Sequence, residues 1–182
     1  QANTSGTDNV AVGDRAGTAI TTGSNNTLIG DVSGTALTTG ASNTAIGANS
    51  FQANTTGEQN TALGKQALES ATTSSYNTAV GGSAGAATTT GANNVFVGYV
   101  AGTANTTGAS NTAVGANALD ASTTASNNVA VGKDALGANT TGATNVAVGS
   151  SALLDNTTGI HNTAVGEESL ANNTTADGNT SI

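Results

Sequence analysis

An asparagine recurs every 17 residues along almost the whole chain, and no insertion or deletion interrupts the spacing. With this asparagine counted as position 1, position 4 is always Val, Ile or Leu, position 5 is Gly, and positions 13 and 14 are Thr. A disordered low-complexity chain does not require such phasing, whereas a stack of equivalent coils does. The repeat therefore predicts a solenoid. Its units begin at Asn9, Asn26, Asn43, Asn60, Asn77, Asn94, Asn111, Asn128, Asn145, Asn162 and Asn179.

The array fills residues 1–182 as a single unit. Residues 2–6 match residues 53–57, and residues 179–182 are positions 1 to 4 of an eleventh repeat. Solenoids need polar caps that block growth at their open ends, and no cap is evident in the sequence. We therefore expect either a piece of a longer array or a unit that stacks end to end on further copies.

Each unit is too short for the helix pairs of helical solenoids, and its recurrent Gly, Asn and Thr disfavour helix. Positions 2 to 4 and positions 11 to 14 instead suit two short strands joined by turns. Proline is absent from the chain, as expected if nearly every backbone N–H pairs with the next coil. The sequence predicts an all-β fold, a parallel β-solenoid (β-roll) of about eleven 17-residue coils.

Alternation along a strand assigns its two faces. We expect the apolar position 4 to point into the coil, and position 2 with it. Position 3 is mostly Ala, with Leu28 and Phe96 as larger exceptions, and we expect this outward apolar face to contact another chain. Position 9 is Leu or Phe in six repeats and Gly in four. Neighbouring side chains are expected to fill the space beside these glycines.

Two columns of the repeat are candidate structural sites. Stacked asparagines form amide ladders and satisfy turn backbone, whereas a glycine that ends a strand supplies a positive φ or a close backbone approach. The predicted Asn ladder is Asn26, Asn43, Asn60, Asn77, Asn94, Asn111, Asn128, Asn145 and Asn162. The predicted turn glycines are Gly30, Gly47, Gly64, Gly81, Gly98, Gly115, Gly132, Gly149 and Gly166.

The invariant Thr pair supplies a candidate outward surface. Neighbours in a strand point to opposite faces, so we expect position 13 to point inward as a hydroxyl ladder and positions 12 and 14 to point outward. The candidate exposed face is Thr22, Thr39, Thr56, Thr90, Thr107, Thr141 and Thr158. A regular Thr array on a solenoid is typical of ice-binding surfaces, which gives an alternative function.

Composition excludes several other classes. The net charge of -8 opposes binding to nucleic acid or anionic membranes, and no apolar run is long enough to insert into a membrane. Cysteine is absent, so no thiolate metal site exists. The single histidine, His161, and the acidic pair Glu167 and Glu168 occupy variable positions. We therefore expect no enzyme, no metal and no cofactor.

The recurring segment Asn-[Thr/Val]-Ala-[Val/Ile/Leu]-Gly, followed three positions later by Ala or Ser, resembles the YadA-like head repeats of trimeric autotransporter adhesins. Residues 145–152 are a close example, and similar repeats occur in phage tail-fibre proteins. The resemblance covers the whole chain. It implies a left-handed parallel β-roll, a homotrimer and a role in adhesion. The repeat is longer than the usual head repeat, and the chain has no neck, heptad stalk or membrane anchor.

Together these features predict a structural or adhesive segment of an extracellular fibre, on a bacterial cell surface or a virion, with a host surface or matrix receptor as partner. Ice binding is one alternative. A passive spacer or a self-stacking filament subunit is another.

Overall fold

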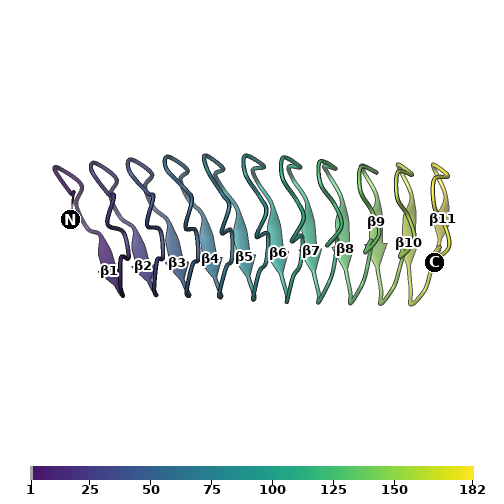
Figure 1. The fold of residues 1–182 in the computed structure, drawn as a ribbon. Helices are drawn as coiled ribbons and strands as arrows, with labels where there is room; N and C mark the ends of the chain where they lie inside the picture. Colours follow the sequence, from purple (N-terminus) through teal and green to yellow (C-terminus); the bar gives the residue numbers. More distant parts are fainter. Residues whose placement is uncertain (1) are drawn as a thin grey trace.

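A computed structural model describes residues 2–182 as a rod of stacked coils, with the two ends of the chain at opposite ends of the rod (Figure 1). Each coil contributes one short strand, and all strands join a single parallel sheet in chain order. The strands are β1 (Val10–Val12), β2 (Thr27–Ile29), β3 (Thr44–Ile46), β4 (Thr61–Leu63), β5 (Thr78–Val80), β6 (Val95–Val97), β7 (Thr112–Val114), β8 (Val129–Val131), β9 (Val146–Val148), β10 (Thr163–Val165) and β11 (Thr180–Ser181). The prediction of an all-β parallel solenoid is confirmed.

The register of the sheet follows the sequence repeat. Thr78 pairs with Val95 and Ala79 with Phe96, so each residue lies beside the residue 17 positions later. β-branched residues favour these strands, and the position-5 glycine ends each of them. Among residues 2–182, no helix is long and apolar enough to cross a membrane.

The predicted second strand at positions 11 to 14 is wrong, because the chain bends there instead of extending. Coils are numbered from coil 1, which begins at Asn9. The backbone N–H groups of Thr21, Thr22 and Gly23 in coil 1 all approach one carbonyl oxygen of coil 2, that of Thr38, at 3.0–3.3 Å. A parallel ladder would send successive N–H groups to different partners. The Thr-Thr-Gly segment is therefore a bend that still joins adjacent coils.

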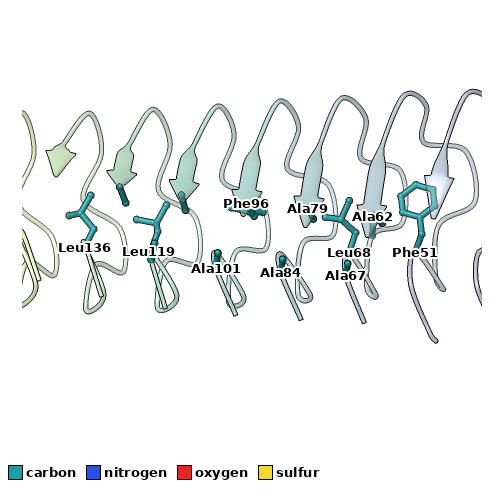
Figure 2. Packing of buried hydrophobic residues seen from close by; sticks show 14 of the residues in the cluster. Phe51, Ala62, Ala67, Leu68, Ala79, Ala84, Phe96, Ala101, Leu119 and Leu136 are labelled. Carbon is teal, nitrogen blue, oxygen red and sulfur yellow. The ribbon is translucent and has the colours of Figure 1, made fainter. Parts of the chain in front are cut away.

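The face assignment of the strand is also wrong. Position 3 is buried in every strand from β2 to β10, whereas positions 2 and 4 are half-buried or exposed throughout. A 17-residue coil encloses a narrow interior, and Leu and Phe side chains from position 9 already occupy much of it (Figure 2). Small Ala residues therefore face inward from the strand, and the bulkier β-branched residues face outward.

The prediction for position 9 is confirmed. Leu28 lies beside two position-9 glycines, and a Cβ atom at Gly17 or Gly34 would fall 2.9 or 2.7 Å from its methyl carbons. Where position 9 is large, as at Leu119 and Leu136, its side chain is fully buried in every coil except the tenth, where Leu170 is half-buried. All position-9 residues have φ between 49° and 59°, a left-handed conformation that costs a non-glycine residue about 1 kcal/mol. Burial of the side chain offsets this cost.

Candidate functional site

The position-1 asparagines form a continuous ladder inside the rod. The backbone N–H and the Nδ2 of Asn43 donate to Oδ1 of Asn26 at 3.0 and 3.1 Å, and Nδ2 of Asn43 also donates to the carbonyl of Gly57 at 2.9 Å. The same bond from backbone N–H to the preceding Oδ1 recurs from coil 2 to the residue Asn179. The nine central asparagines are buried. Their amides are therefore occupied in joining coils.

The position-5 glycines mark the close approach of adjacent coils. Their φ values lie between 121° and 140°, a conformation that L side chains rarely adopt. From Gly30 to Gly149, an added Cβ would lie 2.3–2.5 Å from the carbonyl oxygen of the next glycine in the column. The positive φ and the close approach of the next coil therefore both require glycine at position 5, and the role of this column is structural.

Threonine at position 14 is exposed in all ten repeats, including the seven members of the candidate face. Sequence reasoning omitted Thr73, Thr124 and Thr175, whose coils lack the following glycine. Position 13 is half-buried in the first nine repeats, and its hydroxyl there donates to the next coil, as from Thr38 Oγ1 to the carbonyl of Thr55 at 2.9 Å. The outward placement of position 12 is wrong, because this position is buried in the first nine repeats. The outer Thr surface is a single row.

Positions 2 and 4 form a second outward surface, which sequence reasoning missed because it exchanged the two faces of the strand. We call it the strand face. It consists of Thr or Val at position 2 and Val, Ile or Leu at position 4 in every complete repeat. Leu63 is 42% exposed and Val148 36%. Apart from Leu63, the strand face is an uninterrupted surface of β-branched residues along the sheet.

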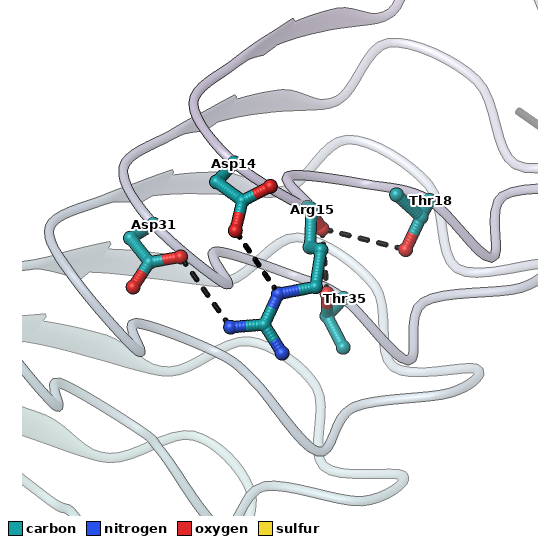
Figure 3. Close-up of polar contacts among 5 residues, drawn as sticks. All are labelled: Asp14, Arg15, Thr18, Asp31 and Thr35. Carbon is teal, nitrogen blue, oxygen red and sulfur yellow. Dashed lines mark hydrogen bonds and ion pairs between the residues drawn. The ribbon is translucent and has the colours of Figure 1, made fainter.

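No charged residue lies on the strand face or in the Thr row at position 14. Every Asp, Glu, Lys and Arg lies at position 6, 7, 10, 11, 16 or 17. One charged group, in the first two coils, joins Arg15 to Asp14 at 3.3 Å and to Asp31 at 3.6 Å (Figure 3). These side chains are more than half exposed, and such surface pairs contribute little to stability. Among the described residues, no group of three or more His, Cys, Asp or Glu could hold a metal ion.

Two carboxyls in coils 7 and 8 have shifted pKa values. Partial burial raises the pKa of Asp120, and the negative charge of Asp134 adds to the rise. The Asn117 amide donates to Asp134 at 2.8 Å and, with the Lys133 ammonium at 3.0 Å, lowers the pKa of Asp134. His161, Glu167 and Glu168 are exposed and lie apart from this pair along the rod. The structure brings none of them together into a catalytic arrangement among residues 2–182.

The outward columns are thus the strand face, the Thr row at position 14 and the variable charged positions between them. No protein family, curated protein or solved structure matches the chain. The chemistry of these columns is therefore the basis on which a function is proposed.

Proposed function

We propose that this chain is a structural segment of an extracellular fibre, in which several copies pack side by side along their strand faces. The observation that supports this proposal is the uninterrupted, charge-free and, apart from Leu63, β-branched strand face of the eleven-stranded sheet. Its position-4 column of Val, Ile and Leu is a contiguous, partly exposed apolar stripe, and apolar surface of this kind is typical of protein–protein contacts. A bacterial adhesin head or a phage tail fibre, trimeric as the family resemblance implies, fits this arrangement.

The dimensions of the strand face suit such a contact. At about 4.8 Å per strand, eleven strands extend about 50 Å, and two outward columns with their side chains cover a width of about 10 Å. A contact between two such faces removes roughly 1,000 Å² from solvent, which is the lower bound for a stable specific interface. Because all coils have the same spacing, a contact made by one coil repeats at every other coil. Position 3, which we expected at this contact, is inside the coil and contributes nothing to it.

In this proposal, the residues at the variable positions of the repeat would bind the receptor. Positions 6, 7, 10, 16 and 17 hold all the charged residues except Asp155, which is at position 11, and also the exposed Tyr76 and Tyr99. They lie beside, not on, the strand face, so they stay accessible when copies pack together. Repetition of weak contacts along several parallel chains raises avidity without any single strong site. A host surface or matrix receptor is the partner that we propose for them.

Light scattering across a concentration series tests the assembly. We expect a stable trimer that becomes monomeric when Leu63→Lys and Val148→Lys place two charges on the strand face. The matched control carries Thr73→Lys and Thr158→Lys, which place the same charges on the Thr row of the same two coils and should leave the trimer intact. Circular dichroism verifies that each variant is folded. A folded wild-type monomer would overturn the proposal, and open-ended polymers would favour the self-stacking filament.

Ice binding is a second candidate, and the exposure of the Thr row in all ten repeats favours it. The row repeats at about 4.8 Å and carries no charge. Its hydroxyls and methyls form one row only, because position 12 is inside the coil and position 13 donates to backbone. The test is thermal hysteresis of a freezing solution. Activity that is lost on Thr90→Lys and Thr107→Lys would support this function, and its absence in the wild type would exclude it.

A further inference from the structure

Position 12 forms an interior column whose chemistry changes along the rod. In the last three complete coils it is Asn139, Asn156 and Asn173, and these amides are joined directly. Asn156 Nδ2 donates to Asn139 Oδ1 at 2.9 Å, and Asn173 Nδ2 donates to Asn156 Oδ1 at 3.0 Å. The asparagine amides at position 12 of adjacent coils therefore lie within hydrogen-bonding distance of one another. An amide is long enough to bridge the distance between two coils.

The middle of the column lacks these bonds. In coils 5, 6 and 7, position 12 is Thr88, Asn105 and Ser122, all with no exposed surface. Thr88 Oγ1, Asn105 Oδ1 and Ser122 Oγ have no hydrogen-bond partner among the described residues. Asn105 Nδ2, by contrast, donates to the carbonyl of Gly108 at 3.1 Å. Three unpartnered polar oxygen atoms thus belong to one column in three successive coils.

The coils are held in register at this point. The backbone N–H of Thr89 donates to the carbonyl of Thr106, and that of Thr106 to the carbonyl of Thr123, each at 2.8 Å. Adjacent position-12 side chains are consequently one coil spacing apart, about 4.8 Å. In the structure neither the Thr88 hydroxyl nor the Ser122 hydroxyl pairs with the Asn105 amide across that spacing. A water molecule that makes two hydrogen bonds of about 2.8 Å can connect two such oxygens.

Leaving these atoms without partners would be costly. Each buried polar atom without a hydrogen bond costs about 1–3 kcal/mol, and buried polar groups of folded proteins are paired with protein or with ordered water. A cation is disfavoured, because no charged residue occupies an inward position of the repeat and a bare ion would have no counter-charge. The chemistry of the column therefore suits a neutral donor and acceptor.

We propose that coils 5 to 7 bind ordered water inside the rod, one molecule between Thr88 Oγ1 and Asn105 Oδ1 and a second between Asn105 Oδ1 and Ser122 Oγ. The amide oxygen accepts one hydrogen from each water, using both lone pairs. Each hydroxyl completes the bridge as donor or acceptor. The position-12 column is then joined directly by its amides toward the C-terminal end of the rod, and through bound water molecules in the middle of the rod. This inference is independent of the fibre proposal.

Magnetic relaxation dispersion of the water deuterons, which counts long-lived internal waters, tests the inference. Thr88→Asn with Ser122→Asn would extend the direct amide ladder from coil 5 to coil 10, and we expect the count to fall by about two relative to the wild type. Thr90→Asn, on the exposed surface of coil 5, is the control and should leave the count unchanged. An equal count in the wild type and the double variant would overturn the proposal.

A second variant keeps the test decisive if the larger amides do not fit. Thr88→Val has the same shape without the hydroxyl, and we expect it to lose one internal water and to retain the fold. High-resolution diffraction of the wild type would locate the waters directly. A discrete density peak within about 2.8 Å of both Thr88 Oγ1 and Asn105 Oδ1 is expected. A dry column in that map would contradict the inference.

Discussion

The ring of Phe96 lies against Gly102, so close that a Cβ atom at Gly102 would be 2.4 Å from two ring carbons. The same ring lies beside Gly85 in the preceding coil, where a Cβ would be 2.7 Å away. Strand position 3 and turn position 9 face each other across the interior. A large residue at position 3 of one coil therefore occupies the space beside position 9 in that coil and in the one before it.

We expect Phe96→Ala to destabilise the rod by about 3–5 kcal/mol, because it opens a cavity between two glycines that cannot fill it. Chemical denaturation measures the loss. The rescue variant adds Gly85→Leu and Gly102→Leu, which reproduces the arrangement of Ala113 with Leu119 in coil 7. Recovery of most of the lost stability is expected. A rescue variant no more stable than Phe96→Ala would contradict the exchange of volume between positions 3 and 9.

Replacing a single asparagine of the Asn ladder by alanine should lower the free energy of unfolding. Asn94→Ala removes the acceptor of the Asn111 backbone N–H, at 2.9 Å, and the donor to the Gly108 carbonyl, also at 2.9 Å. The Gly108 carbonyl keeps its bond from Asn105 Nδ2 at 3.1 Å, so the Asn111 backbone N–H is the buried group left unpaired. We expect a loss of about 1–3 kcal/mol in thermal or chemical unfolding. Thr107→Ala, on the exposed row, should change stability by less than about 0.5 kcal/mol. Similar losses in the two variants would show that the ladder is dispensable.

Two glycines in adjacent coils should respond in opposite ways to alanine. At Gly98, φ is 140° and a Cβ would lie 2.4 Å from the carbonyl oxygen of Gly115. Gly98→Ala must therefore move backbone, and we expect a loss of several kcal/mol or failure to fold. At Gly82 a Cβ would lie 3.5 Å from the Tyr99 ring, an ordinary contact. Gly82→Ala should be neutral or stabilising by up to about 1 kcal/mol. The melting temperatures of the two variants provide the comparison.

The two shifted carboxyls predict opposite pH dependences. The pKa of Asp120 is raised in the folded chain, so the folded state binds this proton more tightly than the unfolded state. Stability then falls as pH rises from the ordinary Asp value through the raised pKa. Asp120→Asn should raise the melting temperature slightly at pH 7 and leave it unchanged near pH 3. A gain of equal size at both pH values would point to a cause other than titration.

The pKa of Asp134 is shifted in the opposite direction from that of Asp120, so its effect on stability has the opposite pH dependence. Its pKa is lowered, first by the Asn117 amide, so its contribution is present at neutral pH and is lost as pH falls through the lowered value. Asp134→Asn should lower the melting temperature slightly at pH 7, and the difference from the wild type should vanish in acid. Both shifts belong to partly exposed groups, and the effects are small for that reason.

Sequence spacing was sufficient to predict the coil, its period and the alignment of equal positions, because an unbroken array leaves only one register. Leu28 and Phe96 occur only where two position-9 glycines adjoin, but the sequence analysis assigned position 3 to the outward face and so did not pair them with those glycines. Alternation separates the two faces of a strand but does not show which one is inside. Hydrophobicity favoured Val over Ala for the interior, whereas the narrow coil has space only for Ala at position 3 wherever position 9 is Leu or Phe.

The bend at Thr-Thr-Gly was missed for a related reason. Neighbouring threonines favour a strand by intrinsic preference, and the sequence does not show that three N–H groups meet at one carbonyl. The interior position of the column that contains Thr88 and Asn105 followed from that bend. It could not be predicted from a strand-like alternation.

The corrected assignment of the strand faces predicts that substitutions at Ala113 and Val114, which are neighbours in β7, differ in their effect on stability. Ala113 is fully buried, whereas Val114 lies half-buried on the strand face. Ala113→Leu adds volume beside Leu119 and should cost about 1–3 kcal/mol through overpacking, while Val114→Thr keeps its shape and should cost less than about 0.5 kcal/mol. Both are measured by chemical denaturation in the Leu63→Lys, Val148→Lys background, so that contacts between copies do not contribute. If Val114→Thr destabilised the rod more than Ala113→Leu, Val114 would belong to the interior and the Ala column at position 3 to the surface.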